Sequence, residues 1–302
     1  MAKVVVAGGV NIDIGARSAG KLRLRDSNPG YVRTGLGGVG RNIAHNLTLL
    51  GVETELLTAL GGDDYARAVA ASCRELGIGI DRALRVPEAH TSTYVYINNE
   101  DGDMAVAVSD MAICERLTPD YFAARLDTLN GAALVVADTN LPEASLRYLA
   151  EKLTVPLFID PVSVTKAEKL RELLPHIHTL KPNALEAELL SGVPVVDRNS
   201  ARRAARRLID LGVRRVFLSL GKEGFLAAAE DETVWQPAPE AKVVSTTGAG
   251  DALMAAIAWA YTRGENLTRT ASLGAAAAAV TIESADTISP RLSAATVLAR
   301  AV

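Results

Sequence analysis

Cysteine occurs only twice in this sequence, and aromatic residues make up only 4% of its 302 residues. Cys73 and Cys114 lie far apart, so we expect two reduced thiols and no disulfide framework, and the four histidines have no metal-ligand spacing. No apolar run reaches the ~18 residues of a membrane span, and the N-terminus lacks a secretory signal. The net charge of −3 indicates no surface for a polyanion. The sequence therefore predicts a cytoplasmic protein with no membrane or nucleic-acid partner.

Alanine and valine supply much of an apolar content of 49%, and strand-like runs alternate with helical patterns. This alternation predicts an α/β fold with a mostly parallel sheet covered on both faces. We expect strands at Val4–Ala7, Thr54–Ala59, Leu134–Ala137, Leu157–Ile159, Thr179–Leu180 and Val216–Ser219. We expect helices at Val39–Leu50, Asp64–Leu76, Glu143–Lys152, Lys166–Leu174, Ala184–Ser191, Ala201–Leu211 and Ala252–Tyr261.

Polar residues follow most of the predicted strands. Because ligands bind beyond the carboxyl ends of parallel strands, this row predicts the rim of an active site. The row consists of Asn11, Asp13, Asp138, Asn140, Asp160, Lys181, Asn183, Ser219 and Gly221.

Two segments, about 14–36 and 90–111, depart from the parallel pattern. The second alternates polar and apolar residues around a turn at Asp101-Gly102, as a β-hairpin does. We interpret both as a small antiparallel lid inserted in a single domain of residues 1–302, and the alternative is a hairpin without function at a sheet edge. An exposed edge of this lid would favour a homodimer.

The stretch Ser245-Thr246-Thr247-Gly248-Ala249-Gly250-Asp251 is the most informative motif. We expect its threonines to end a strand and its aspartate to lie in the first turn of a helix, where free N–H groups bind anions. A carboxylate beside a phosphate site can accept the proton of an attacking hydroxyl. The motif thus predicts phosphoryl transfer to an alcohol, although an acid in a first turn is also ordinary capping.

A second glycine motif, from Gly35 to Asn42, opens the helix predicted from Val39. It is neither a dinucleotide fingerprint nor a P-loop. Bare backbone at Gly37 and Gly38 suits a polyol, and Asn42 would face the same pocket. Asn11 and Asp13 could meet it, since a carboxylate accepts two vicinal hydroxyl protons.

Taken in order, these motifs resemble the ribokinase (PfkB) family of carbohydrate and nucleoside kinases over nearly the full chain. The resemblance depends on Asn11-Ile12-Asp13, Gly37-Gly38 with Arg41-Asn42, Asn183 with Glu186, and Gly248-Ala249-Gly250-Asp251. It implies a three-layer αβα sandwich with a mostly parallel central sheet and a small antiparallel β lid that often forms a dimer interface. It also implies ATP as the phosphoryl donor, with Mg²⁺.

The resemblance implies a role for each motif. Asp251 would be the catalytic base, and the N–H groups of Gly248, Ala249 and Gly250 the anion hole. Asp13, Gly38 and Asn42 would contact the ribose. Glu186, with Asn183, would orient Mg²⁺ through water. The nucleotide site would further include Lys181, Ser219, Gly221 and Gly224, with apolar walls from 273–282 for the adenine. Ser245 stands where members that use a monovalent cation commonly have an acid, which puts K⁺ activation in doubt.

The stretches Asp26–Gly30, Asn99–Met111, Asp160–Ser163 and His178–Asn183 further resemble those family members that phosphorylate the 5′-hydroxyl of the C-nucleoside pseudouridine. Kinases of the same family that act on ribose, fructose or adenosine are the alternative. A sugar-binding sensor without catalysis is less consistent with Asp251, and a metal-free hydrolase ranks last because no Gly-X-Ser-X-Gly elbow is present. The candidates for reading the base are Asn28, Thr93, Asp110, Asn140 and Lys166.

Overall fold

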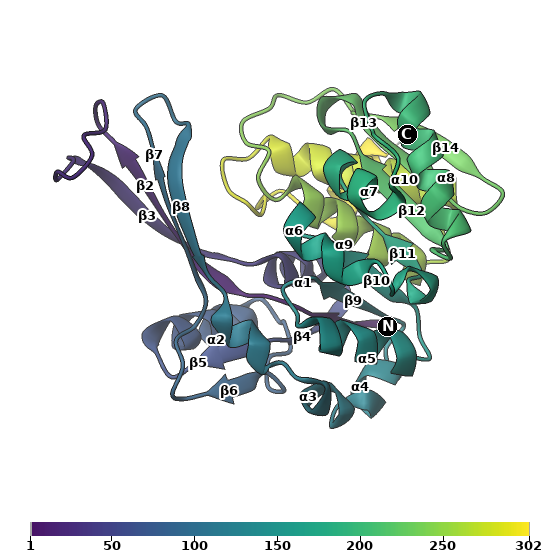
Figure 1. Cartoon of the computed structure of the whole chain (residues 1–302), viewed down its shortest axis with the longest axis horizontal. Coiled ribbons are helices and arrows are strands. Elements are labelled where there is room, and N and C mark those ends of the chain that lie inside the picture. Colours follow the sequence, from purple (N-terminus) through teal and green to yellow (C-terminus); the bar gives the residue numbers. More distant parts are fainter. Residues whose placement is uncertain (1, 302) are drawn as a thin grey trace.

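A run of parallel strands and one hairpin build the main sheet of the computed structural model, which describes residues 2–301 (Figure 1). Its parallel strands pair in the order β12-β11-β10-β9-β1-β4, and β13 and β14 extend it as an antiparallel hairpin beside β12. All six predicted strands belong to this sheet. The bounds are β1 (Lys3–Ala7), β4 (Glu53–Leu57), β9 (Leu134–Asp138), β10 (Leu157–Asp160), β11 (Thr179–Leu180), β12 (Arg215–Ser219), β13 (Gly224–Ala228) and β14 (Thr233–Pro237).

Helices cover both faces of this sheet, because alternate residues of its strands point to opposite sides. In β1, Val4 and Val6 pack into one core and Val5 and Ala7 into the other, and all four are fully buried. The first core includes α1 (Val39–Leu49), α2 (Asp64–Glu75), α9 (Ala249–Thr262), α10 (Leu267–Ile282) and α11 (Ala294–Arg300). The second includes α3 (Pro119–Ala123), α4 (Leu126–Asn130), α5 (Glu143–Lys152), α6 (Val164–Ala167), α7 (Ala184–Ser191) and α8 (Arg198–Asp210). The predicted three-layer sandwich is confirmed.

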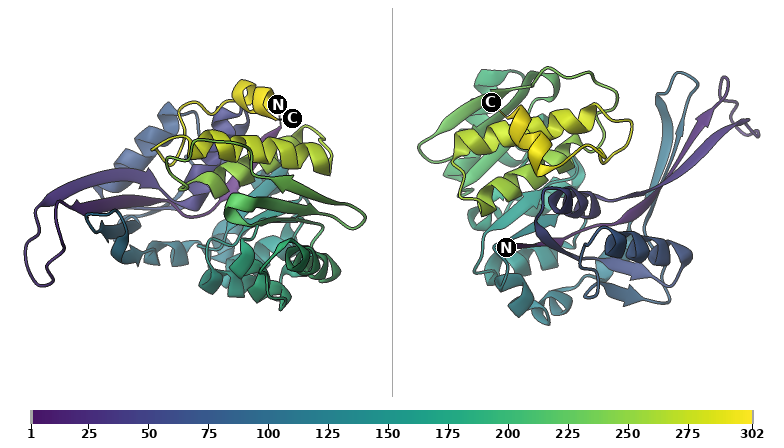
Figure 2. Two further views of the ribbon diagram at one scale, coloured as in Figure 1. Left: turned by 90° about the horizontal axis from the view of Figure 1, so that it is seen from above. Right: turned by 180° about the vertical axis from the view of Figure 1, so that it is seen from behind.

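A second sheet projects from this body as a long arm (Figures 1 and 2). Its order is β3-β2-β7-β8, with bounds β2 (Asn11–Ser18), β3 (Gly30–Gly37), β7 (Thr93–Asn98) and β8 (Met104–Asp110). The outer pairs are antiparallel as predicted, but the central pair β2–β7 is parallel. At the foot of the arm, β5 (Ala59–Gly61) pairs with β6 (Leu84–Val86).

The arm has two chemically different faces, which follow from the pairing of its strands. Asp13 lies beside Tyr94, and Gly15 beside Tyr96, so these residues share one face, which we call the Asp13 face. Residues one position away point to the other side. That side, the Val95 face, is mainly apolar and contains Ile14, Val32, Val95, Val106 and Val108.

Three local expectations were wrong. The helix expected over 166–174 is broken into α6 and 3₁₀ turns, and Pro175 lies in the last of these. The strand expected over 54–59 ends at Leu57, because Ala59 begins β5 in another sheet. No strand precedes Gly248, because residues 238–247 pass over the end of α10 and leave Val243 and Val244 exposed.

Of the helices within residues 2–301, none has the length and hydropathy that a membrane span requires.

Candidate active site

Four charged side chains meet where the carboxyl ends of β9, β10 and β11 face the first turn of α9. Asp138 ends β9, Asp160 ends β10, Lys181 follows β11, and Asp251 lies in α9. Lys181 Nζ is 3.1 Å from Asp160 Oδ2, and both side chains are more than nine-tenths buried. Parallel strands bring these residues to one edge of the sheet, as the row of polar residues predicted.

Asp251 has an environment that suits a general base. Burial is the main cause that raises its pKa to about 7, and the nearby Asp160 and Asp138 carboxylates raise it further. Asn42 Nδ2 donates to Asp251 Oδ2 at 2.9 Å, and Lys181 also favours the ionised form. A base whose pKa lies near neutral pH can both accept and release a proton efficiently.

The N-terminus of α9 is shaped to bind an anion. Gly248 caps the helix with a φ of +83°, and a Cβ there would stand 2.0 Å from the carbonyl oxygen of Thr287. The N–H groups of the first turn have no partner within the helix, and the helix dipole favours negative charge there. Lys181 Nζ lies 3.2 Å from where a Cβ of Gly250 would be. Burial lowers the pKa of Lys181, but the Asp160, Asp251 and Glu186 carboxylates raise it more, so the ammonium adds positive charge at this helix end.

Asp13 forms a polar group beside the start of α1. Asn11 Nδ2 donates to Asp13 Oδ1 at 2.6 Å, and a Cβ on Gly37 would lie 2.2 Å from Asp13 Oδ2. Burial raises the pKa of Asp13, while Asn11 and the guanidinium of Arg41 lower it. The carboxylate therefore lies against backbone that only glycine can provide.

Gly38 sets the direction in which α1 begins. It caps the helix with a φ of +99°, and a Cβ there would lie 2.5 Å from the Gly9 carbonyl oxygen. The helix that follows places Asn42 against Asp251. The second glycine motif is thus connected directly to the candidate base.

Asn140 and Lys166 also meet at this edge, because Lys166 Nζ donates to Asn140 Oδ1. The neighbouring Asp138 accepts the N–H groups of Gly9 at 2.9 Å and Asn140 at 2.8 Å. Burial raises the pKa of Asp138 to about 6. These contacts connect the polar residues after β1 and β9 in one network.

The structure does not bring Asn28, Thr93 or Asp110 to Asp13. Asn28 lies in the turn between β2 and β3, where its side chain bonds the backbone of Arg23 and Asp26. Thr93 and Asp110 are paired on the Val95 face and line a cavity of about 520 Å³ that also contacts Asp63 and His90. The period of two in a strand separates them from Asp13.

Tyr94 and Tyr96 are aromatic residues of this hairpin that lie on the Asp13 face, and their ring centroids are 5.7 Å apart. Neither tyrosine is among the candidates that the sequence indicates for reading the base. The sequence does contain a signal for them, which is the alternating run 93–97. Successive residues of a strand point to opposite faces, so the two tyrosines share one face and their neighbours in the run share the other.

Asn183 and Glu186 form a capping box at the start of α7. Glu186 Oε2 accepts the Asn183 N–H at 2.8 Å, and Asn183 Oδ1 accepts the Glu186 N–H at 3.0 Å. Burial raises the pKa of Glu186. Oε1 of Glu186 is not part of the capping box. Within residues 2–301, no three His, Cys, Asp or Glu side chains are grouped as direct metal ligands.

The three remaining nucleotide-site candidates lie at the end of β12. Ser219 pairs with Asn183 in an isolated parallel bridge, which connects the two strand ends. Gly221 has a φ of +57° and open space around it. Gly224 has a φ of +105°, and a Cβ there would lie 2.1 Å from the Gln236 carbonyl oxygen, so the β13–β14 pairing alone explains this glycine.

Comparisons with known proteins identify the family of this chain. The family model described as "pfkB family carbohydrate kinase" matches residues 1–294. The chain is 39% identical over 263 residues to pseudouridine kinase of Escherichia coli, with 86% of this chain and 84% of that protein covered. It is 35% identical over 294 residues to an uncharacterized sugar kinase of the same organism, with 96% and 81% covered.

Among solved structures, the ribokinase of Arabidopsis thaliana complexed with ribose and ATP superposes with a TM-score of 0.87, covering 99% of this chain and 98% of that one. At 24% identity, this likeness establishes the fold. The predicted ribokinase-like architecture is therefore confirmed. The chain belongs to the PfkB family of carbohydrate kinases and is a phosphotransferase.

Proposed function

We propose that this sugar or nucleoside kinase transfers the γ-phosphoryl group of ATP to the 5′-hydroxyl of pseudouridine. The observation that carries the proposal is the half-buried Asp251 carboxylate, with a pKa of about 7, in the first turn of the helix that forms the anion site. The similarity to pseudouridine kinase supports this nucleoside as the acceptor.

In the proposed reaction, Asp251 accepts the proton of the 5′-hydroxyl while the hydroxyl oxygen attacks the γ-phosphorus. The bond from that phosphorus to the β,γ-bridging oxygen breaks, and ADP leaves with the electron pair. Negative charge on the transferred group faces the N–H groups of Gly248, Ala249 and Gly250 and the ammonium of Lys181. Asn42 holds the carboxylate in place through its 2.9 Å hydrogen bond.

Glu186 fits the chemistry of an indirect Mg²⁺ site, because Mg²⁺ keeps several waters and binds through carboxylates and substrate phosphates. The capping box uses Glu186 Oε2, and Oε1 can accept from a metal-bound water. When bound, Mg²⁺ would neutralise charge on the phosphates of ATP. Asn183, Ser219 and Gly221 lie at the neighbouring strand ends, where the nucleotide would bind.

Asp13 would accept the ribose hydroxyl protons, with Asn11 orienting it. On the same face of the arm, Tyr94 and Tyr96 offer ring surface against which a base could stack. Asn140 and Lys166 present hydrogen-bonding groups at the edge of the main sheet for the polar edge of that base. We therefore assign base recognition to these four residues in place of Asn28, Thr93 and Asp110.

A second copy of the chain is the proposed partner of the Val95 face. Val32 is 68% exposed, Val106 52% and Val108 65%, which is unusual for one face of a sheet. The turn between β2 and β3 contains Lys21, Arg23 and Arg25, whereas the turn between β7 and β8 contains Glu100, Asp101 and Asp103. Two arms related by a two-fold axis can bury their apolar faces and pair these opposite charges.

The test is ADP formation with Mg²⁺ and ATP against pseudouridine, uridine, adenosine, ribose and fructose. We expect a preference of at least about tenfold in kcat/KM for pseudouridine. Asp251→Asn should abolish turnover and leave pseudouridine binding nearly intact, while Asp64→Asn, in the exposed first turn of α2, should change neither. A preference for a sugar would retain the role of Asp251 but reject the nucleoside, and substantial turnover by Asp251→Asn would reject the base.

A further inference from the structure

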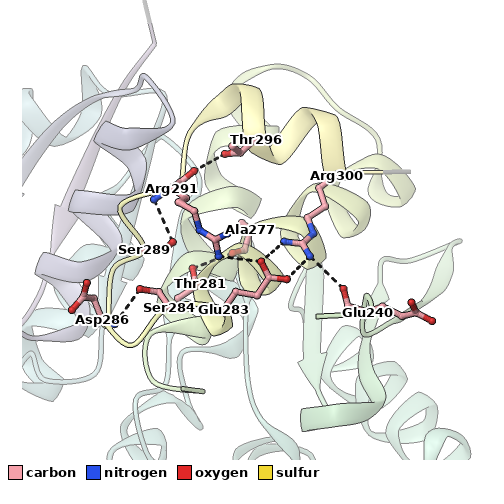
Figure 3. Close-up of polar contacts among 10 residues, drawn as sticks. All are labelled: Glu240, Ala277, Thr281, Glu283, Ser284, Asp286, Ser289, Arg291, Thr296 and Arg300. Carbon is pink, nitrogen blue, oxygen red and sulfur yellow. Dashed lines mark hydrogen bonds and ion pairs between the residues drawn. The ribbon is translucent and has the colours of Figure 1, made fainter. Parts of the chain in front are cut away.

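Glu283, Arg291 and Arg300 form a compact ion-pair cluster at the C-terminal end of α10 (Figure 3). Arg300 binds the carboxylate with both nitrogens of its fork, at 2.5 Å from Nη2 to Oε1 and 2.9 Å from Nη1 to Oε2. Arg291 Nη2 donates to Oε2 at 3.1 Å. Paired guanidinium contacts of this kind fix geometry as well as charge. The cluster therefore ties residue 291 and α11 to the end of α10.

The same helix end holds the chain that leads into the anion site. The carbonyl oxygen of Ile282, in the last turn of α10, accepts the N–H groups of Val244 at 2.8 Å and Ser245 at 3.2 Å. Arg300 Nη2 also donates to the Glu240 carbonyl oxygen at 3.3 Å. Residues 240–245 are thus fastened to α10 and to the cluster just before the anion site begins.

The segment between Glu283 and Arg291 contacts the anion site directly. The carbonyl oxygen of Thr287 would be 2.0 Å from a Cβ on Gly248, so these two backbones are as close as glycine permits. Both ends of this segment are held by the cluster, since Glu283 and Arg291 bind each other. A shift of the segment would be transmitted to the N–H groups at the start of α9.

We propose that Glu283, through Arg291 and Arg300, is a positioning residue for phosphoryl transfer. It sets the backbone of 282–289, which in turn sets residues 244–248 and the anion-site N–H groups. The inference rests on the phosphoryl-transfer chemistry proposed above, and it does not depend on which hydroxyl is the acceptor. It is therefore tested with whichever substrate the wild-type protein uses best.

Glu283→Gln keeps the shape of the side chain and removes its charge. We expect kcat to fall about tenfold, which is less than the ~10²–10³ that removal of a whole oxyanion donor produces. The acceptor KM should change by less than about twofold, because the contacts that lead from the cluster to the anion site do not include Asp13. The matched control is Glu265→Gln, which removes the Arg263–Glu265 ion pair (3.4 Å) at the other end of the α9–α10 hairpin and should leave kcat within about twofold.

A chemical rescue separates positioning from folding. The cluster borders a cavity of about 250 Å³ lined by Val280, Glu283, Arg291, Thr296, Ala299 and Arg300, which gives small anions a route to the guanidinium groups. For Glu283→Ala, added formate should restore kcat at least about threefold, by pairing with both arginines. Chloride at the same ionic strength should not, and neither anion should affect Glu265→Ala.

An unchanged kcat in Glu283→Gln would overturn the proposal. So would a loss of kcat that follows the loss of folded protein, measured by circular dichroism at the assay temperature, or a loss equal to that of Glu265→Gln. If Glu283→Ala does not fold, Glu283→Gln and Arg291→Met are decisive, and both must lower kcat at constant acceptor KM. Failure of the proposed function would appear in the wild-type substrate panel, whereas failure of this inference would appear in the ratio of variant to wild type.

Discussion

Asp251→Asn should make the protein more stable at neutral pH although it abolishes turnover. Burial raises the pKa of Asp251 from 3.8 to about 7 in the folded protein. The folded state therefore holds a proton that the unfolded state releases, and stability falls as the pH rises from about 4 to about 7. Asparagine has no charge to bury and can still accept the hydrogen bond of Asn42. The variant removes a penalty that the wild type accepts in order to function.

The size of the effect follows from the pKa difference. About three pH units at about 1.4 kcal/mol each give a gain of about 4 kcal/mol above pH 7, as an upper limit. Between about pH 4 and 7 the gain should grow by about 1.4 kcal/mol per unit, so it should be about 2 kcal/mol at pH 5. For a chain of this length, each kcal/mol raises Tm by about 2 °C.

The assay is urea unfolding of both proteins at pH 5, 6, 7 and 8. The free energy of unfolding of Asp251→Asn should exceed that of the wild type by an amount that rises with pH and levels off above about 7. The exposed Asp64→Asn serves as the control and should show no such trend. A gain that is the same at every pH, or a variant less stable at pH 8, would refute the argument that a buried ionised carboxylate destabilises the fold.

Three further predictions follow from the same contacts. The kcat/KM should fall about tenfold per pH unit below about pH 7, because the base must be ionised, and a flat profile down to pH 6 would contradict the role of Asp251. Gly248→Ala should lower kcat, and it should lower the free energy of unfolding by about 2 kcal/mol or more, because it adds a clash with Thr287 to the strain of a positive φ. Gly264 has a φ of +71° and open space around it, so denaturation of Gly264→Ala should show a smaller loss. Val108→Asp should convert the proposed dimer to a monomer in sedimentation, whereas Ser109→Asp on the opposite face should not.

The sequence predicts the main sheet, and it also predicts which candidate catalytic residues lie at one edge of that sheet, because both are encoded locally. Each parallel strand is a short buried apolar run, and the polar residue after it marks the edge where Asp138, Asp160 and Lys181 meet. The glycines that permit close backbone contact lie within the sequence motifs themselves. The Asn42–Asp251 hydrogen bond joins two of these motifs, which are 209 residues apart.

The residues that we propose to read the base could not be assigned in the same way. Thr93 and Asp110 are polar and belong to the same hairpin as Tyr94 and Tyr96, but strand pairing places them on the Val95 face. Asn28 lies at a turn where its side chain is used by local backbone. The face of a strand that points to a substrate depends on the register of that strand with β2. Register is a relation between two segments, so it cannot be read from one run of residues alone.

The helix that carries Asp251 is also one of the most deeply buried elements of the molecule. Every residue from Ala252 to Ala260 is buried, and in α10 a Cβ on Gly274 would lie 2.5 Å from Leu253 Cδ1. A core change at Gly274 would therefore push on a residue two positions from the proposed base, and we expect it to be measured as a catalytic defect. The arm is free of this constraint, because much of its surface packs against nothing in the chain. New acceptor specificities should consequently be reachable by substitutions on the arm, while the chemistry of the reaction stays fixed by the core.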